Sequence, residues 1–561
     1  MTRTALGNTA VGQAPGKGVL VLGDLRTMDP VNPRARAMAV RDGQILAVGE
    51  PGQVAGRLPA GTPVLDCGRQ AVMPGFIDSH HHLLWTGMAA VRVDLGAADS
   101  IAELSRRLTG WADQHPHREW VVSAEGWEVA DLAERRYPTR FELDRCCPGR
   151  PVYLPRGGHA GVANSVALAR AGISDDTPDP RGGIIERDHT GAATGLLLER
   201  ARDLVATHVP PPTLNERLDA LDAAQQTCLG QGITRILDPG LTHEEVDAYL
   251  TARDSGRLRL RASLLGLVTS GPDAVAEAAS FLPLIRDPGW DDRLRLCGLK
   301  VFVDGGGSLG TAWLTKEYPG LNGYHGERLI EKPDLDALLA YAAEHGVPVG
   351  AHTVGDAAID AVLTSIAGLS CGTDLAPGHF SLIHAYLWPS TASLGLAAER
   401  GVAVAAQPGM YARFAETLAQ RFGWSATEAA SPLRSWLEAG VILGGGSDSP
   451  VTTSSPLGGI HDAVTRDHKG RVLGPGERLD RQQAVEMYAG GAALIAQVGG
   501  QEGILRPGAR ADWVVLEGDP LTCRDDELPG LEVLATAVAG EIVHRSPGWT
   551  HGGCGLGTSD E

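Results

Sequence analysis

Residues 73–82 read Met-Pro-Gly-Phe-Ile-Asp-Ser-His-His-His, a short apolar run followed by three consecutive histidines. The apolar run at residues 75–77 predicts a buried strand that ends just before the histidines. Because side chains alternate between faces along a strand, His80 and His82 are expected to point one way and His81 the other. Two imidazoles on one face can bind one cation, and imidazole suits zinc and neighbouring divalent metals. The alternative for this segment alone is a solvated histidine cluster or a chance run.

The composition is that of an acidic globular protein. Hydrophobic residues make up 43% and charged residues 21% of the 561 residues, as in ordinary folded proteins. The net charge of −19 argues against a nucleic-acid partner and favours a small-molecule substrate. No apolar run reaches the ~18 residues of a membrane span, and residues 1–17 lack the apolar core of a secretory signal, so the expected compartment is cytoplasmic. The eight scattered cysteines are expected to be reduced and without a catalytic role.

The two ends of the chain share a strand-rich pattern. Short strands are predicted at residues 18–22, 37–41, 44–48, 64–66, 511–516 and 534–544. Neither end is long enough to bury a large core alone. Residues 1–72 and 500–545 are therefore predicted to pair into one composite β-sandwich, with the rest of the chain inserted between them. The tail at residues 546–561, rich in Gly, Ser and Thr, is expected to be loose.

Between the two ends, apolar strand-like runs alternate with helical patterns, as is typical of βαβ units and a parallel sheet. Eight strands are predicted, at residues 75–78, 233–237, 258–267, 296–303, 348–352, 381–384, 402–407 and 441–445. Helices are predicted at residues 214–229, 335–345 and 356–366. Residues 73–499 are therefore predicted to form an α/β fold, a (β/α)8 TIM-type barrel with its chemistry at the C-terminal strand ends. The long connection at residues 118–200 is predicted to be an insertion that covers the barrel mouth as a lid.

Further side chains that could bind a metal follow other predicted strands. Lys300 lies within the fourth strand, His352 and His384 end the fifth and sixth, and Asp448 follows the eighth. Each has an ordinary explanation when taken alone: a structural histidine, an ion-paired lysine, or an aspartate that caps a helix. Their shared position at matching strand ends favours a metal site over coincidence.

Taken together, these motifs resemble the amidohydrolase superfamily and, within it, amidohydrolase family 3, the branch that includes N-substituted formamide deformylase. The motifs occur in the family's order at residues 74–82, 157–160, 164–165, 300–305, 352–356, 384–385, 407–408, 447–451 and 503–516. One departure is Ile383, where family members often carry Glu. A polar contact is missing there, so the substrate pocket is expected to differ at this point.

The resemblance implies a centre of one or two divalent metal ions, with zinc the expected metal. The implied ligands are His80, His82, Lys300, His352, His384 and Asp448. The histidines of the first strand would bind the more buried ion, with the aspartate in contact, and the other two histidines would bind a second ion. A carboxylated lysine at Lys300 would bridge the two ions, because a carbamate is an oxygen-bearing anion whereas an ammonium group cannot ligate a cation. An unmodified lysine would imply a single ion. The resemblance also suggests a homodimer.

The expected reaction is hydrolysis of a non-peptide C–N bond, such as an N-formyl or N-acyl amide. A bound metal lowers the pKa of water from about 15.7 toward about 7. Asp448 would take a proton from this water and deliver it to the leaving nitrogen. Candidate substrate-binding residues are His159 in the insertion, Asn164 and Trp85. For His159 the alternative is a turn histidine that stabilises the insertion.

Two other functions stay open. A deaminase of the same superfamily would release ammonia from an amino-substituted heterocycle, and such enzymes typically use one metal and a Glu shortly after the strand-five histidine. This chain has no Glu at residues 353–356, which favours amide hydrolysis. A non-catalytic metal-binding protein would be marked by the loss of a ligand, and no candidate ligand is missing.

Overall fold

The structure, a computed structural model, describes residues 18–369 and 375–549. The predictions for residues 1–17, for most of the tail after residue 545, and for Cys371 and Cys554 therefore concern residues outside the described ranges. None of the helices in these ranges is long and apolar enough to cross a lipid bilayer.

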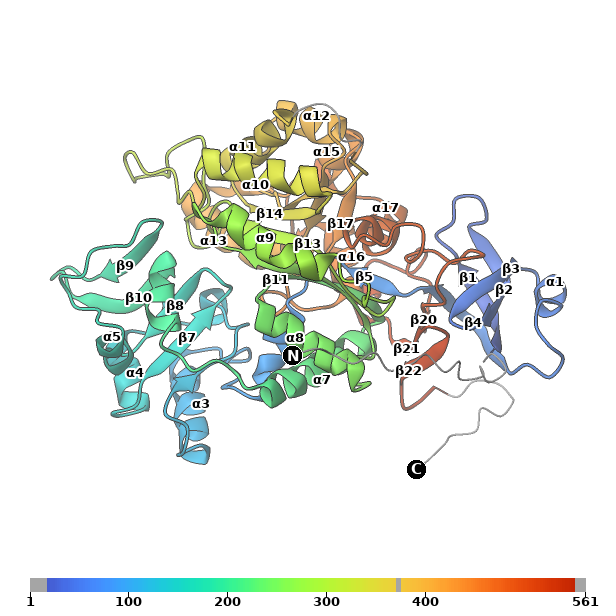
Figure 1. Ribbon diagram of the computed structural model, residues 1–561, viewed down its shortest axis with the longest axis horizontal. Coiled ribbons are helices and arrows are strands. Elements are labelled where there is room, and N and C mark those ends of the chain that lie inside the picture. Colours follow the sequence, from blue (N-terminus) through green and yellow to red (C-terminus); the bar gives the residue numbers. More distant parts are fainter. Residues whose placement is uncertain (1–17, 370–374, 550–561) are drawn as a thin grey trace, which may run out of the picture.

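An eight-stranded parallel sheet forms the centre of the molecule (Figure 1). In chain order its strands are β5 (Phe76–Asp78), β11 (Ile233–Leu241), β12 (Arg261–Val268), β13 (Leu294–Phe302), β14 (Val349–Thr353), β15 (Phe380–His384), β16 (Ala403–Ala406) and β17 (Leu443–Gly445). Each strand pairs with the next along the chain. The sheet closes where the backbone N–H of Ser79, after β5, donates to the carbonyl of Gly445 at 3.0 Å. The eight predicted barrel strands are confirmed, with ends that differ by only a few residues.

Helices follow the barrel strands and pack on the outside of the sheet. They are α7 (Leu214–Gly230), α8 (His243–Asp254), α9 (Ala274–Ile285), α10 (Lys332–His345), α11 (Asp356–Ala367), α12 (Thr391–Glu399), α13 (Pro408–Phe422), α14 (Trp424–Glu428), α15 (Leu433–Glu438), α16 (Pro456–Thr465), α17 (Arg481–Glu486) and α18 (Ala492–Ile495). Their beginnings are fixed by local sequence. Thr242 and Glu245 form a capping box at the start of α8, so two backbone N–H groups that the helix leaves unpaired gain partners.

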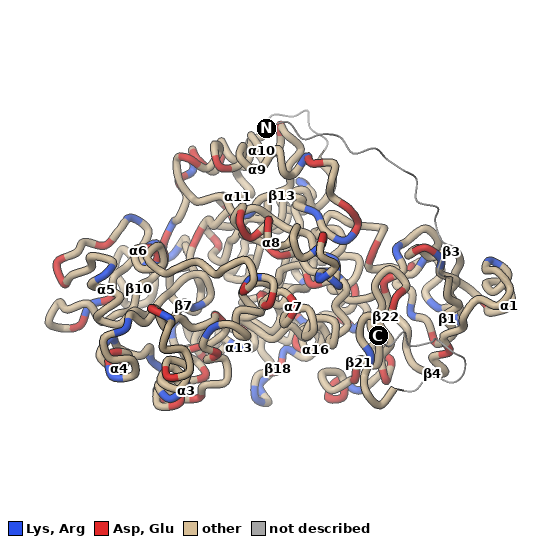
Figure 2. The backbone as a smooth tube through the Cα atoms, turned by 60° about the horizontal axis from the view of Figure 1, so that its bottom comes forward, with Lys and Arg blue, Asp and Glu red and all other residues tan. Residues whose placement is uncertain are grey.

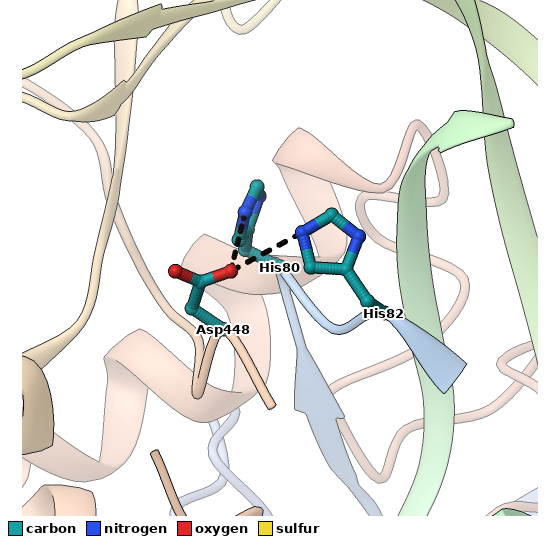
Figure 3. A group of neighbouring side chains, drawn as sticks. All are labelled: His80, His82 and Asp448. Carbon is teal, nitrogen blue, oxygen red and sulfur yellow. Dashed lines mark ion pairs between the residues drawn. The ribbon is translucent and has the colours of Figure 1, made fainter. Parts of the chain in front are cut away.

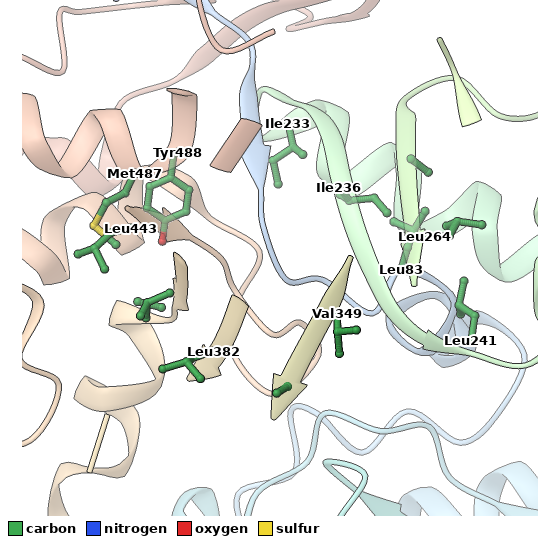
Figure 4. Packing of buried hydrophobic residues seen from close by; sticks show 14 of the residues in the cluster. Leu83, Ile233, Ile236, Leu241, Leu264, Val349, Leu382, Leu443, Met487 and Tyr488 are labelled. Carbon is green, nitrogen blue, oxygen red and sulfur yellow. The ribbon is translucent and has the colours of Figure 1, made fainter. Parts of the chain in front are cut away.

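The main core lies between the barrel strands and these helices. Figure 4 shows part of it, with Ile236 and Leu264 from neighbouring strands packed toward the helices. Buried side chains of this cluster extend along the chain from Ala71, on the last strand before the barrel, to Val538 near the C-terminus. Because the strands are covered on both faces, their sequences are nearly continuous apolar runs, and such runs could be recognised in the sequence.

The two ends of the chain form one β unit beside the barrel (Figure 1). Its strands are β1 (Gly18–Arg26), β2 (Arg34–Arg41), β3 (Gln44–Gly49), β4 (Val64–Pro74), β20 (Trp513–Leu516), β21 (Val533–Val538) and β22 (Glu541–Arg545). All seven belong to a single sheet, because β4 pairs with β1 on one side and with β20 on the other. The pairing of distant terminal segments into one β unit is confirmed.

A large insertion separates the first two barrel strands, as predicted. It contains a five-stranded sheet of β6 (Val121–Val122), β7 (Val152–Arg156), β8 (Ala160–Ala163), β9 (Gly183–Arg187) and β10 (Ala193–Glu199). Helices α3 (Ile101–Gln114) and α4 (Arg140–Cys146) share a core with one face of this sheet. The insertion lies on the opposite side of the barrel from the terminal β unit (Figure 1).

Charged residues are distributed over all three parts of the chain. Acidic residues outnumber basic ones by 68 to 49. Figure 2 shows acidic and basic positions interspersed along the barrel, the insertion and the terminal β unit. The net negative charge is therefore spread over the molecule rather than confined to one segment.

Candidate metal centre

Two of the three histidines after β5 face Asp448, which lies in the loop after β17. Nε2 of His80 lies 3.1 Å from Oδ1 of Asp448, and Nε2 of His82 lies 3.2 Å from the same oxygen. Figure 3 shows both imidazoles directed toward the carboxylate. The ligand atoms of these three buried side chains all lie within 4.8 Å of one another. One cation can therefore contact all three.

His81 points away from this group, as predicted, although β5 ends at Asp78 and all three histidines follow the strand. Its Nδ1 lies 3.2 Å from Oδ2 of Asp78, and its Nε2 lies 3.6 Å from Sγ of Cys228. Asp78 also accepts hydrogen bonds from the backbone N–H of His80 at 3.1 Å and of Ser447 at 3.0 Å. One buried carboxylate thus joins the histidine segment to the loop after β17.

Two of the candidate ligands have left-handed backbone conformations. The φ angle is 54° at Asp448 and 76° at His384. Such angles cost a non-glycine residue about 1–3 kcal/mol and persist only where the surrounding structure imposes them, often at functional sites. The backbone N–H of Asp448 donates to the carbonyl of His80 at 2.7 Å, which holds the aspartate beside the histidines.

His352 and His384 end β14 and β15 and lie beside the first group. The ring centroid of His384 lies 5.1 Å from that of His80 and 4.6 Å from that of His352. Lys300, on β13, is 1% exposed, and its Nζ lies 4.9 Å from the centroid of the Phe302 ring. The structure therefore brings all six side chains predicted as metal ligands to one end of the barrel.

The outward nitrogens of two of these rings have fixed partners. Nδ1 of His384 lies 2.7 Å from Oε1 of Gln407, and Nε2 of His352 lies 3.5 Å from the carbonyl oxygen of Gly305. The opposite nitrogen of each ring is then left for a ligand. In metal sites such a partner fixes the orientation and tautomer of the ligating histidine. His80 differs, because its buried Nδ1 has no hydrogen-bond partner among the residues that the structure describes.

Burial favours the neutral form of three of these imidazoles, those of His80, His352 and His384. It lowers the pKa of His80 to about 3 and the pKa values of His352 and His384 well below the ordinary range. Burial alone would raise the pKa of Asp448, but the neighbouring His80 and His82 outweigh it and hold that pKa well below its usual value. Metal ligands must be unprotonated, so neutral imidazoles around an ionised carboxylate fit a divalent cation such as zinc.

Burial also changes the amine of Lys300. It lowers the pKa of Lys300 to about 7, and the carboxylate of Asp448 only partly opposes this shift. A substantial fraction of the amine is therefore unprotonated at neutral pH. The unprotonated amine is the form that reacts with carbon dioxide to give a carbamate.

A cavity of about 50 Å³ lies against the histidines. Its lining includes His159, His352, His384, Tyr386, Met410, Phe414, Asp448 and Val451. A larger cavity of about 510 Å³ adjoins it. The two share the lining residues Glu128, Arg156, Ser308, Leu309 and Phe414. The insertion and the barrel together thus enclose the space beside the candidate metal ligands.

The three residues predicted to bind substrate lie in different places. His159 lines the small cavity, and its ring centroid lies 4.7 Å from that of His352. Trp85 stacks on His82 with ring centroids 4.2 Å apart, so it supports a candidate ligand. Asn164 is fully buried and caps helix α5 (Ser165–Arg170), where its side chain accepts a hydrogen bond from the backbone N–H of Ala167. The structure does not bring Asn164 to the cavity.

Sequence reasoning missed several polar groups around the cavity. Glu199 lies 2.9 Å from Nδ1 of His159, and Glu128 forms a buried ion pair with Arg156. Gln407 was noted only as part of a motif, yet it contacts His384. The available signal was weak: Glu199 ends an apolar strand of the insertion, as the candidate ligands end barrel strands.

The class of protein follows from comparison with known families. The amidohydrolase family matches residues 64–544, which is most of the chain. The chain therefore belongs to the amidohydrolase family and is a hydrolase of that superfamily.

Individual relatives agree with this assignment. YtcJ of Bacillus subtilis is 30% identical over 541 residues, which cover 93% of this chain and 98% of YtcJ. N-substituted formamide deformylase of Arthrobacter pascens is 30% identical over 553 residues, which cover 94% of this chain and 98% of that enzyme. The crystal structure of an uncharacterized metal-dependent hydrolase from Pyrococcus furiosus superposes with a TM-score of 0.70 at 26% identity, covering 90% of this chain and 100% of the other.

Proposed function

We propose that this protein hydrolyses the C–N bond of an N-formyl or short N-acyl amine, giving a carboxylic acid and an amine, with the help of one or two divalent metal ions. The observation that carries the proposal is the buried group of His80, His82 and Asp448 beside His352 and His384 at the C-terminal ends of barrel strands. That end of the barrel is where enzymes of this fold carry out chemistry.

The proposed metal ligands divide into two sets. His80, His82 and Asp448 would hold one ion, and His352 and His384 would hold a second. Three or four nitrogen and oxygen donors of this kind suit zinc, which is the proposed metal. When bound, such an ion lowers the pKa of a coordinated water toward about 7 and so supplies a nucleophile at neutral pH.

Asp448 is the proposed proton carrier. Its carboxylate lines the small cavity and contacts both His80 and His82, so a proton carrier at this position would adjoin both the proposed metal ligands and the space for the substrate. An ionised carboxylate can accept one proton from the attacking water. The same group can then return this proton to the leaving nitrogen, so that the amine departs neutral.

Lys300 is the proposed bridge between the two sets of ligands. A positively charged amine beside a cation would be repelled by it. Burial brings the pKa of Lys300 to about 7, which makes the unprotonated amine available for carboxylation by carbon dioxide. The resulting carbamate would provide two oxygen ligands and a negative charge.

The dimensions of the cavities support a small acyl group. A water molecule needs about 10–15 Å³ of such space, so the inner cavity of about 50 Å³ accommodates only a few heavy atoms. The adjoining cavity of about 510 Å³ has room for a much larger group. A formyl or short acyl group near the histidines and a bulkier amine portion outside fit this division. The similarity to N-substituted formamide deformylase favours the same class of substrate.

Deamination is the alternative within the superfamily. In place of a Glu after His352 the chain carries Asp356, and this carboxylate accepts a hydrogen bond from the backbone N–H of Thr315 at 2.9 Å. Asp356 thus already has a structural partner. This contact favours amide hydrolysis over deamination.

The proposed function is tested by measuring metal content, intact mass and hydrolytic activity of the purified protein. Elemental analysis of the purified protein should give about two equivalents of metal per chain, and intact mass under native conditions should show one added carbon dioxide. N-formyl and N-acyl amines should then be hydrolysed, with formation of the acid and the amine in equal amounts. One equivalent of metal without the adduct, together with ammonia release from aminated heterocycles, would instead establish the deaminase.

A further inference from the structure

We propose that Glu199 is a positioning residue that holds His159 with its proton on Nδ1, so that Nε2 faces the cavity as a hydrogen-bond acceptor. Such an acceptor selects substrates whose scissile nitrogen carries a hydrogen. The inference rests on the proposed amide hydrolysis for its substrate, but the tautomer of His159 can be tested without any activity.

Two hydrogen bonds join Glu199 to His159. Nδ1 of His159 lies 2.9 Å from Oε2 of Glu199, and the backbone N–H of Glu199 donates to the carbonyl of His159 at 2.6 Å. The two residues are forty positions apart in sequence but are neighbours at one edge of the inserted sheet, because His159 directly precedes β8, Glu199 ends β10, and these two strands pair. These two hydrogen bonds restrain His159 both at its backbone carbonyl and at its ring.

Glu199 is itself fixed by the barrel. Its other carboxylate oxygen, Oε1, accepts a hydrogen bond from the hydroxyl of Thr311 at 2.6 Å and a weaker one from the backbone N–H of Gly306 at 3.4 Å. Both donors belong to the connection after β13. The side chain is 2% exposed, and the backbone has a φ angle of 49°, which is unfavourable for any residue except glycine. A strained, buried and fully bonded glutamate is typical of a constrained functional position.

The turn before His159 directs its ring toward the candidate metal ligands. Gly157 and Gly158 have φ angles of 56° and 72°, a left-handed pair that glycine adopts without strain. The His159 ring lies with its centroid 4.7 Å from that of His352 and 5.6 Å from that of Phe302. His159 lines the small cavity whereas Glu199 does not, so Glu199 acts through the imidazole.

The chemistry of the pair sets the tautomer. A carboxylate can only accept hydrogen bonds, so a neutral His159 must carry its proton on Nδ1, and Nε2 then has a lone pair. A lone pair directed into the cavity complements the N–H of a secondary amide. An N,N-disubstituted amide offers no such donor and leaves Nε2 of His159 without a partner. We therefore expect a lower kcat/KM for such an amide.

Glu199→Gln is the informative substitution because it keeps the size of the side chain and changes the pattern of donors. Thr311 and Gly306 both donate to Oε1, so the amide oxygen of glutamine is expected to take that position. The amide NH2 then faces Nδ1 of His159 and donates to it. The imidazole proton must move to Nε2, which turns the cavity-facing acceptor into a donor.

The experiment compares hydrolysis of an N-formyl amine with that of its N-methyl derivative. The wild type should prefer the N–H substrate by about tenfold or more in kcat/KM, and Glu199→Gln should lose most of this preference through a fall in kcat/KM for the N–H substrate. Glu119→Gln, an exposed glutamate just before β6 of the same sheet and outside both cavities, is the matched control and should keep the wild-type ratio. An unchanged ratio in Glu199→Gln would overturn the proposal.

Nitrogen NMR of histidine-labelled protein gives the second readout. The His159 signals are identified by their loss in His159→Gln. A proton on Nδ1 alone in the wild type, and on Nε2 alone in Glu199→Gln, supports the proposal. A proton on Nε2 in the wild type overturns it. If the wild type cleaves no N-acyl amine at all, the proposed function fails, and the tautomer still decides whether Glu199 positions His159 in this way.

Discussion

In the proposed mechanism Asp448 has two tasks, because its carboxylate contacts His80 and His82, which follow β5, and also lines the small cavity. Asp448→Asn preserves the shape of the side chain and one ligating oxygen but cannot take up a proton. We therefore expect kcat for the best N-acyl amine to fall by roughly 10²–10⁴-fold, with most of the metal retained. Steady-state kinetics and elemental analysis of the same sample check this. Asp467→Asn, at an exposed position, is the control. A variant with near-normal kcat would remove Asp448 from the mechanism.

The amine of Lys300 should control the second metal ion. Lys300→Met keeps the volume but cannot be carboxylated, so we expect about one equivalent of metal in place of two, and no added carbon dioxide in the intact mass. The unprotonated amine reacts, and the pKa is about 7, so carboxylation of metal-free protein should be favoured at pH 8 and suppressed at pH 6. Lys332→Met, an exposed lysine on α10, should behave as the wild type. Two full equivalents in Lys300→Met would contradict the bridge.

At the scale of elements, the site depends on the junction of β5 with the loop after β17. Asp78 accepts hydrogen bonds there from the backbone of His80 and from both the backbone and the hydroxyl of Ser447, the last at 2.6 Å. Asp78→Ala leaves these buried donors unpaired at about 1–3 kcal/mol each and frees both ligand segments. We expect a lower Tm and a metal affinity weakened about 10–100-fold, as for other supporting residues of metal sites. Competition titration with a chelator measures the affinity.

Asp113→Ala provides the control for this experiment, since Asp113 is exposed on α3, away from the junction. It should match the wild type in both metal affinity and Tm. If Asp78→Ala lowered only the Tm and left the metal affinity within twofold of the wild type, the two ligand segments would be held together by other contacts. The role assigned to Asp78 would then be limited to stability.

The elements also show which features the sequence alone could predict. The barrel strands were predictable because strands covered on both faces are continuous apolar runs, and candidate ligands at their ends follow from strand polarity. The contact of Glu199 with His159 could not be predicted, because it depends on how two strands of the insertion pair. Asn164 illustrates the reverse case: a residue that belongs to a family motif caps a helix in the structure.

At the scale of the whole molecule, a buried ion-pair network joins the barrel to the segment that leads into the terminal β unit. Arg235 on β11 and Arg510 contact Glu502 at 2.6 and 2.5 Å, and Arg261 on β12 contacts Asp512 at 2.6 Å. Arg235 and Arg261 lie in the N-terminal halves of their strands, at the opposite end of the barrel from the candidate metal ligands. In this fold that end serves stability rather than chemistry.

Glu502 is the residue whose removal should weaken this network most. Burial alone would raise its pKa, but Arg235, Arg261 and Arg510 outweigh burial and lower the pKa from 4.5 to about 2. A depressed pKa stabilises the fold fully above about pH 4.5, and this stabilisation is lost as the pH falls toward 2. Glu502→Gln leaves buried arginines without their partner, so we expect urea unfolding at pH 7 to show a free energy of unfolding lower by roughly 3 kcal/mol than in the wild type. This difference in free energy should become smaller below pH 4.5. The exposed Glu517→Gln should show no such loss. If the difference in free energy of unfolding stayed constant with pH, packing rather than charge would account for the lower stability of the variant.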